Sequence, residues 1–590
     1  PAMDNCRHSG LKKHFVKSYK PITTRLYFPK FLTEGDVLKA KTMVANYTKI
    51  PVAGEFYYFL NGKKNATRIT LENYFSKTIE LEPAVLGKPL FFESGFKLTN
   101  GYLDAERRIL KIIPSTVITG FSDFRDLQTD TSFILKWEKD NIESFVTFYN
   151  SKLHSALSLF ESFDRYYYSD NQTQINILEA LLIKEKLGLT LDLGKDYSHQ
   201  IKKLMKRIAG SQNPLGWFGY FKSSRFQNIF LTARMAEVFY RADKQGYDNN
   251  TYYNACIWMQ KQLKKQSNEE RIAILYSLKK CNRNSNFKNE LARVNAKTLS
   301  ISGKLRFQFL SQKVKGTSNS MEIKQMLETT PLGNVQVPGS FYKAWCRTYF
   351  DAGNNTFLAW EVLYASKLES KTRKKLIDAM LERPYGNAYS KALAAQAFIT
   401  EYSLGENLKF IPDLTVNDKK LSAKDYPATY EIKKGEELSI TKKGVQVYMV
   451  SDRSFKSYNP KSDLQEFDIR TSIGKRDSNI YHIKTSDEFV LSVNVLAKTN
   501  QGQVVIDIPI PAGCIYAEKR FGERYNEIHR EYRKDRVLIY LNSMNFGNHT
   551  YHIPLRALHK GTFNTAPGRV SQLDYSDKAS YTERKKFIID

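Results

Sequence analysis

Long hydrophobic runs are absent from this chain of 590 residues. Uninterrupted apolar stretches such as residues 537–541 are far shorter than the roughly 20 residues that a membrane-spanning helix needs. Cysteine is also scarce, because the chain has only five, and an odd number cannot all pair internally. The sequence therefore indicates neither a helical membrane protein nor a disulfide scaffold. Cys256 lies among apolar residues at helical spacing and is predicted to be a core residue.

Several functional signatures are missing as well. The chain has no Gly-x-Ser-x-Gly nucleophile motif and no Cys/His pairs at zinc spacing. Its net charge of +29 comes from 90 Lys and Arg against 61 Asp and Glu, but these cations are spread along the whole chain. No recognition helix and no RNA-binding aromatic signature accompanies them. We therefore expect no nucleic-acid partner, no metal and no cofactor.

The order of strand-like and helical patterns divides the chain into three regions. Residues 20–118 alternate apolar and polar side chains between turn signals such as Asn61-Gly62, which predicts an antiparallel β-sandwich. Residues 138–405 repeat apolar side chains at helical spacing, which predicts about a dozen helices joined by short loops. Residues 408–590 return to alternation. Because the helical hairpins follow one another without a strict sequence period, a closed α/α toroid is favoured over an open repeat.

Motifs at both ends resemble the bacterial alpha-2-macroglobulin family. Residues 507–514 (DIPIPAGC), 529–536 (HREYRKDR), 551–557 (YHIPLRA) and 561–567 (GTFNTAP), followed by Tyr575, resemble its final macroglobulin-like domain. Lys534 departs from the family pattern, which has Asp there. Residues 26–36 and 44–48 resemble the sandwich that precedes the thioester domain, and residues 216–218 (GWF) and 231–233 (LTA) resemble elements of that domain. The motifs are loose singly but stand in the family's order.

The resemblance implies a multidomain fold of α and β parts. An antiparallel β-sandwich at 20–108 would come first, and a C-terminal macroglobulin-like β-sandwich at 466–590 would come last. Between them, a small CUB-like β domain would be split into 109–137 and 408–465. The thioester-type toroid, at 138–407, would be inserted in that domain. Strands on the two sides of the insertion would then pair, and the toroid would pack on the last sandwich.

The segment that matches the family's reactive motif lacks its sulfur. Family members join a Cys sulfur to a Gln side chain in Cys-x-Glu-Gln, because a thiolate forms near neutral pH and leaves easily. Residues 166–174 read YYYSDNQTQ here, so that Ser169 replaces Cys and Asn171 replaces Glu, while Gln172 is retained. Independently of this alignment, no cysteine in the chain has Gln three residues on. We therefore predict that no thioester forms, and that the segment is a packed structural junction.

By resemblance, aromatic side chains would shield this junction, as they shield the family's thioester. The candidates are Tyr166, Tyr167 and Tyr168, with Tyr532 or Tyr540 opposite.

The resemblance implies a non-enzymatic protein of the bacterial periplasm or cell envelope. Its partners would be proteases, trapped without a covalent bond after they cut a bait segment upstream of this chain. Contact with a membrane would be made only through an upstream lipid anchor.

Two other functions are consistent with the sequence. A structural or partner-binding envelope protein could retain this scaffold without trapping. Polysaccharide lyases and glycosidases also use α/α toroids, and a glycosidase needs two carboxylates at one cleft, which the sequence alone does not pair.

Overall fold

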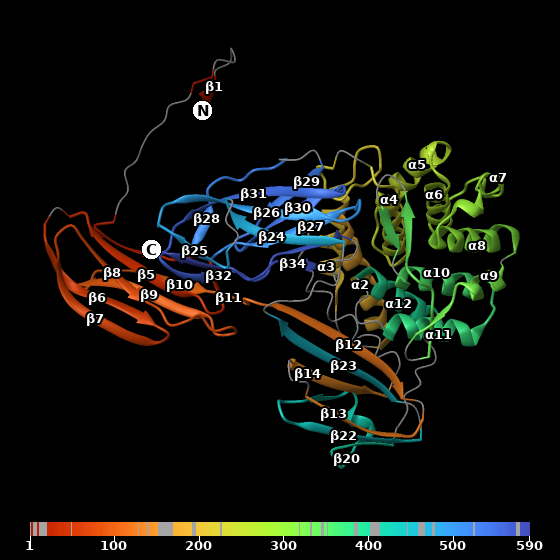
Figure 1. Cartoon of the computed structure of the whole chain (residues 1–590), viewed down its shortest axis with the longest axis horizontal. Helices are drawn as coiled ribbons and strands as arrows, with labels where there is room; N and C mark the ends of the chain where they lie inside the picture. The colour runs from red at the N-terminus through yellow and green to blue at the C-terminus, as the bar shows by residue number, and fades with distance from the viewer. Residues whose placement is uncertain are drawn as a thin grey trace.

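The computed structural model describes residues 2–3, 9–10 and 20–590, with gaps inside the last range. The gaps are residues 49, 128, 138–140, 151–168, 192–195, 225–226, 318, 331–332, 344–346, 351, 383–387, 402–412, 445–446, 458–465, 475–477, 523–525 and 574–578. Figure 1 shows two neighbouring β-sandwiches, a helical domain and a smaller β domain. The multidomain fold predicted from the sequence is confirmed. Within the described residues, no helix combines the length and the apolar character needed to cross a membrane.

The first sandwich is formed by strands whose side chains alternate between core and solvent. One sheet has the order β10-β9-β6-β7. The turn between its strands β6 and β7 is Asn61-Gly62, where both residues have positive φ (47° and 85°), as a tight hairpin requires. The strands of this sandwich are β3 (Ile22–Tyr27), β5 (Val37–Asn46), β6 (Val52–Leu60), β7 (Lys63–Leu71), β8 (Tyr74–Glu80), β9 (Leu90–Leu98) and β10 (Leu103–Leu110).

The last sandwich consists of a four-stranded and a five-stranded sheet. The first has the order β24-β26-β31-β28 and the second β29-β30-β27-β33-β34. Their strands are β24 (Phe467–Ile473), β26 (Glu488–Ala497), β27 (Val504–Pro509), β28 (Cys514–Tyr516), β29 (Glu527–Tyr532), β30 (Arg536–Leu541), β31 (Gly547–Ala557), β33 (Arg569–Gln572) and β34 (Ser580–Tyr581). Strand β27 is buried along its whole length because the sheet is covered on both faces.

The two sandwiches are joined by a continuous sheet, which we call the seam. Its order is β25-β35-β32-β5-β3, so three strands from the C-terminal part of the chain continue into two strands of the first sandwich in one ladder. Gly561 pairs with Leu38 where β32 meets β5. The buried Asp36 carboxylate accepts hydrogen bonds from the Asn564 backbone amide (2.7 Å) and the Thr33 amide (2.7 Å). The additional strands are β25 (Ile480–Ile483), β32 (Gly561–Asn564) and β35 (Lys586–Ile589).

One hydrophobic core continues across the seam, with Leu38 and Phe92 of the first sandwich in the same cluster as Val493 and Phe563 of the last. The sequence predicted a sandwich near each end of the chain, without a contact between them being considered. The structure packs the two as neighbours, because strands more than 500 residues apart complete one sheet.

The small β domain is formed by strands from both sides of the helical insertion. Strand β12 pairs with β23 along eleven residues, β13 pairs with β22, and β14 pairs with both β21 and β23. The predicted pairing across the insertion is therefore confirmed. The strands are β12 (Val117–Leu127), β13 (Thr131–Lys136), β14 (Asn141–Tyr149), β19 (Asp413–Val416), β20 (Lys419–Lys420), β21 (Ala428–Glu431), β22 (Glu437–Lys443) and β23 (Val447–Ser457).

The structure corrects one boundary of this domain. The sequence placed residues from 138 onward in the helical toroid, but β14 belongs to the small β domain. Its Ser144, Val146 and Phe148 are buried, and the latter two lie in this domain's core.

The helical domain is a closed ring, as the sequence favoured. Successive inner helices contact one another in the order α2, α4, α6, α8, α10 and α12, and α12 returns to α2. The described helices are α2 (Asn171–Leu191), α3 (Ser198–Ala209), α4 (Ile229–Lys244), α5 (Thr251–Gln262), α6 (Asn268–Lys280), α7 (Phe287–Ala292), α8 (Ile301–Lys315), α9 (Ser320–Gln325), α10 (Ala352–Ala365), α11 (Ser370–Glu382) and α12 (Ala388–Glu401). Its first inner helix, α2, begins beside the last sandwich.

Candidate functional site

The sulfur-free segment stands at the N-terminus of helix α2. Asp170 caps the helix, because its carboxylate accepts hydrogen bonds from the backbone amide (2.8 Å) and the hydroxyl (2.7 Å) of Thr173. Its side chain is buried, and burial raises the pKa of this carboxyl. Asn171, the first residue of α2, donates to the Gly219 carbonyl (2.8 Å) and accepts from the Ser211 hydroxyl (2.9 Å). Both residues thus serve the geometry of the helix start.

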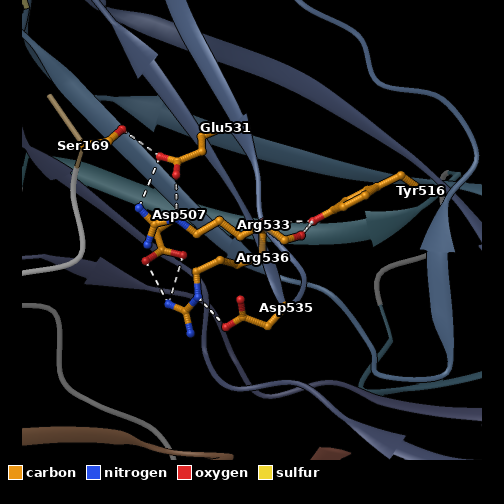
Figure 2. A network of polar contacts seen from close by, with 7 residues as sticks. All are labelled: Ser169, Asp507, Tyr516, Glu531, Arg533, Asp535 and Arg536. Carbon is orange, nitrogen blue, oxygen red and sulfur yellow. Dashed lines mark hydrogen bonds and ion pairs between the residues drawn. The ribbon is translucent and has the colours of Figure 1, made fainter. Parts of the chain in front are cut away.

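Ser169 connects this helix start to the last sandwich. Its hydroxyl donates a hydrogen bond of 3.0 Å to the Glu531 carboxylate on β29. The same carboxylate accepts from the guanidinium of Arg533, at 2.9 Å from Nε and 3.2 Å from Nη2. Figure 2 shows Ser169 approaching this ion pair from a separate segment of the chain. Ser169 therefore places a neutral donor against a carboxylate that is already paired with a guanidinium.

A second ion-pair group supports the sandwich side of this contact. The Arg536 guanidinium lies between two carboxylates, at 3.1 Å from Asp507 and 2.9 Å from Asp535. The Tyr516 hydroxyl, which can donate one proton, lies 2.6 Å and 2.8 Å from the backbone carbonyls of Arg533 and Arg536 (Figure 2). These contacts fix the β29–β30 turn, and with it the direction of the Arg533 side chain.

An aromatic contact lies beside the polar one. Phe221 of the toroid packs against His529 with its ring tilted (ring centroids 4.3 Å apart) and meets Tyr540 edge to face (4.7 Å). Tyr540 is almost completely buried and shares one hydrophobic cluster with Ile175 of α2. Burial lowers the pKa of His529, because the charged imidazolium would lose its hydration. The predicted packing of the toroid on the last sandwich near this segment is confirmed.

The structure brings together only part of the predicted shielding set. Tyr540 faces the toroid, whereas Tyr532 packs on Tyr516 (4.9 Å) and donates to the Arg520 carbonyl. Gln172 is the second residue of α2 and is half-buried. Residues 166–168, which include the three predicted tyrosines, lie outside the described residues.

Sequence reasoning missed the sandwich-side partners of the junction. Glu531 and His529 stand two residues apart on β29, so they project from the same face of the strand. That face is the one that meets the toroid.

The junction holds no thiol among the described residues. Cys256 and Cys281 belong to the core of the helical ring, and Cys514 belongs to the core of the sandwiches. No arrangement of three or more His, Cys, Asp or Glu side chains suited to a metal ion occurs in the described part of the chain. The described residues of the site can therefore form hydrogen bonds and ion pairs.

Buried carboxylates also line the inside of the helical ring. Glu179 on α2 is paired with Arg234 and Arg241 on α4. Glu361 on α10 is paired with Lys280 and accepts a hydrogen bond from the Tyr276 hydroxyl on α6. These pairs cross between inner helices, so they tie the ring together from within.

Comparisons with known proteins agree with this architecture. Residues 464–574 match the family model of the bacterial alpha-2-macroglobulin MG10 domain. The chain is similar to the crystal structure of native alpha-2-macroglobulin from Escherichia coli spanning domain MG7 to the C-terminus. That match has 13% identity and a TM-score of 0.74, and it covers 96% of this chain and 99% of that one. No curated protein sequence matches the chain.

Longer relatives show the same fold. Salmonella alpha-2-macroglobulin reacted with methylamine is 14% identical, with a TM-score of 0.73 over 96% of this chain and 40% of that one. The native conformation of the E. coli protein solved by cryo-EM is 13% identical, with a TM-score of 0.75 over 97% of this chain and 40% of that one. The chain thus spans about 40% of the length of these two relatives.

Proposed function

We propose that this alpha-2-macroglobulin-like chain, whose last sandwich matches the bacterial MG10 domain, takes part in trapping proteases without a covalent bond. The observation that carries the proposal is Ser169, which stands at the start of α2 against the last sandwich and donates to Glu531. A hydroxyl at this place cannot supply the thiolate leaving group of an acyl thioester. The scaffold would therefore act through shape and rearrangement alone.

The proposal includes the surroundings of the protein. Its partners are proteases that cut a bait segment outside this chain, and its compartment is the bacterial periplasm or cell envelope. The family resemblance supports both points, and so does the MG10 match.

The junction contacts give the trapping mechanism a physical basis. The toroid is held on the last sandwich by the Ser169–Glu531 hydrogen bond and by Phe221 against Tyr540. These are reversible contacts, each worth a few kcal/mol or less. A rearrangement after cleavage can therefore separate the two domains without breaking a covalent bond.

A trapping assay with the protein that carries this chain tests the proposal. After incubation with a protease, we expect a complex on a native gel that dissociates completely in SDS. The trapped protease should keep its activity on a small peptide and lose it on a large protein substrate, because the active site is enclosed but not blocked. An SDS-resistant conjugate, or undiminished cleavage of the large substrate, would contradict non-covalent trapping.

One observation supports an enzymatic role as an alternative. Glu237 on α4 has a raised pKa because it is buried, and its charge interacts with that of Glu361. Two neighbouring carboxylates, one of them a weak acid, are what a glycosidase uses. Glu361 is already bound by Lys280 and Tyr276, which favours a structural role. Turnover of a polysaccharide that is lost in Glu237→Gln would support the enzymatic alternative.

A structural or partner-binding role is the second alternative. It predicts a stable complex with another envelope protein and unchanged activity of an added protease on large substrates.

A further inference from the structure

Two cysteines of the helical ring, distant in sequence, meet at one place in its core. Cys256 lies in the second turn of α5, and Cys281 directly follows α6. Their side chains are 1% and 2% exposed and belong to the same hydrophobic cluster. Both are thiols in the structure, and they are close enough for each to shift the pKa of the other.

The turn after α6 holds Cys281 in a defined position. Its backbone amide bonds to the Ser277 carbonyl (2.9 Å), which closes the last turn of the helix. Asn282 then adopts a positive φ of 53°, and the Arg283 amide bonds back to the Leu278 carbonyl (2.9 Å). This is a helix-ending motif that fixes the chain direction, so the Cys281 side chain does not depend on a loose loop for its placement.

Contacts on both sides of the pair hold the same turn against α5. The Arg283 guanidinium lies over the ring of Tyr253, 4.3 Å from its centroid, and 5.5 Å from that of Tyr252. One helical turn beyond Cys256, the Gln260 amide donates to the Asn284 carbonyl (2.8 Å). Because the turn is anchored above and below Cys256, the two sulfurs stay within reach of one another.

We propose that Cys256 and Cys281 are an oxidation site that forms an intramolecular disulfide, which staples α5 to the end of α6. In the reaction, one thiolate attacks the disulfide of a thiol-disulfide oxidant, and the second thiolate then attacks the mixed disulfide. The two cysteines lose two protons and two electrons, their sulfurs become bonded, and the oxidant leaves as two thiols. The periplasm proposed for this protein is a compartment where such oxidants act.

The surroundings of the pair favour this chemistry at Cys256. The neighbouring Cys281 side chain lowers the pKa of the Cys256 thiol, and the nearby positive charge of Arg283 acts in the same direction. Because both side chains are buried in the folded ring, the bond should form while the helices assemble, and reductants should reach it slowly afterwards.

Peptide mapping of the full chain, expressed in a bacterial periplasm, tests the proposal directly. The protein is denatured with an alkylating reagent and digested with trypsin without reductant. We expect the peptide 245–261 linked to the tripeptide 281–283, two hydrogens lighter than their sum, and we expect the link to disappear with dithiothreitol. Complete alkylation of both cysteines, or a bond from either to another cysteine, would overturn the proposal.

A thermal comparison adds a second readout. The bond closes a loop of about 25 residues, so its loss should lower the melting temperature of the helical ring by roughly 5–10 °C. Reductant present during refolding should cause this shift in the unchanged protein but not in Cys256→Ala/Cys281→Ala. Cys514→Ala, which removes a buried thiol from the sandwiches, should retain the sensitivity to reductant. Equal sensitivity in the double variant would overturn the assignment. The test does not involve protease trapping, so the two proposals stand or fall separately.

Discussion

At the scale of single residues, the hydroxyl of Ser169 decides the chemistry of the junction. It donates to the Glu531 carboxylate, which is already paired with the Arg533 guanidinium. A carboxylate paired with a guanidinium is a poor base for a hydroxyl, because removing the proton would place two negative charges beside one positive charge. We therefore propose that the junction is an anchoring contact rather than a reactive one.

Chemical labelling tests this conclusion. We expect the intact mass of the protein to equal its sequence mass, apart from any disulfide, and methylamine to add nothing to residues 169–172. The Salmonella relative, whose solved structure is that of the methylamine-reacted protein, provides the positive control. Incorporation of methylamine at Gln172 would show that an acyl bond forms after all.

Asp36 is the residue that makes the seam sensitive to pH. Burial raises the pKa of its carboxyl to about 7. The hydrogen bonds from the amides of Asn564 and Thr33 lower this pKa, but their effect is smaller than that of burial. The native protein therefore binds more protons than the unfolded chain between pH 4 and 7, roughly. Because the folded-state pKa is raised, the stability of the seam should fall as the pH rises through this window.

A substitution isolates this effect. The unfolding free energy of the sandwiches should show a contribution on the order of 2 kcal/mol that is lost between pH 5 and pH 8, and Asp36→Asn should remove it. Urea titrations at both pH values measure how much the unfolding free energy changes with pH. The two proteins are compared by this change and not by their absolute stabilities. An identical pH dependence in both proteins would contradict the assignment to Asp36.

At the scale of elements, the alternating direction of side chains along a strand explains how the toroid docks on the last sandwich. Alternate residues of β29 point to opposite sides, so His529 and Glu531 face the helices while Tyr532 packs on Tyr516. On β30, Tyr540 pairs in register with His529 and lies against Phe221. One face of a two-stranded hairpin thus provides both the polar and the aromatic contacts.

Two tyrosines of this hairpin form a matched pair for mutagenesis. Tyr540→Ala should cost about 3–5 kcal/mol, because it empties a buried site at the interface. Hydrogen exchange should then rise at the start of α2 and in the segment around Phe221. Tyr532→Ala, on the opposite face, should leave exchange in the toroid unchanged. Equal effects of the two substitutions would contradict the docking role of Tyr540.

Local signals explain which features the sequence could predict. The helical spacing of apolar residues within 138–405 indicated the helices of the ring, and alternation indicated the strands of both sandwiches. Strand β14 has the same alternation at Ser144, Val146 and Phe148, but its partners lie about 280 residues away and the neighbouring helices dominated the interpretation. The pairing of Glu531 with Ser169 depends on tertiary packing, which no local pattern contains.

At the scale of the whole molecule, the seam makes the two sandwiches one cooperative unit. They share the sheet β25-β35-β32-β5-β3 and a continuous hydrophobic core. Gly561 permits the closest approach, because a Cβ atom there would lie 2.3 Å from the Val37 carbonyl oxygen, and its φ is +146°. Only glycine fits this position without displacing β32 from β5.

Calorimetry can test this cooperativity. The unchanged protein should melt both sandwiches in one transition, whereas Gly561→Ala should shift the first sandwich to an earlier, separate one, at a cost of about 2–3 kcal/mol. Gly62→Ala is the control, since its positive φ strains the hairpin but no atom lies within 4 Å of the new methyl group. It should cost about 1 kcal/mol and leave a single transition. Two separate transitions in the unchanged protein would contradict the cooperative seam.

The seam also determines how the molecule bears mechanical load. Strand β3 begins the first sandwich and β35 ends the last, and both belong to one ladder of hydrogen bonds. Tension applied between β3 and β35 would therefore load this ladder, and the helical ring would lie outside the path of the force. The contact through which the helical domain docks at Ser169 would then bear none of this load.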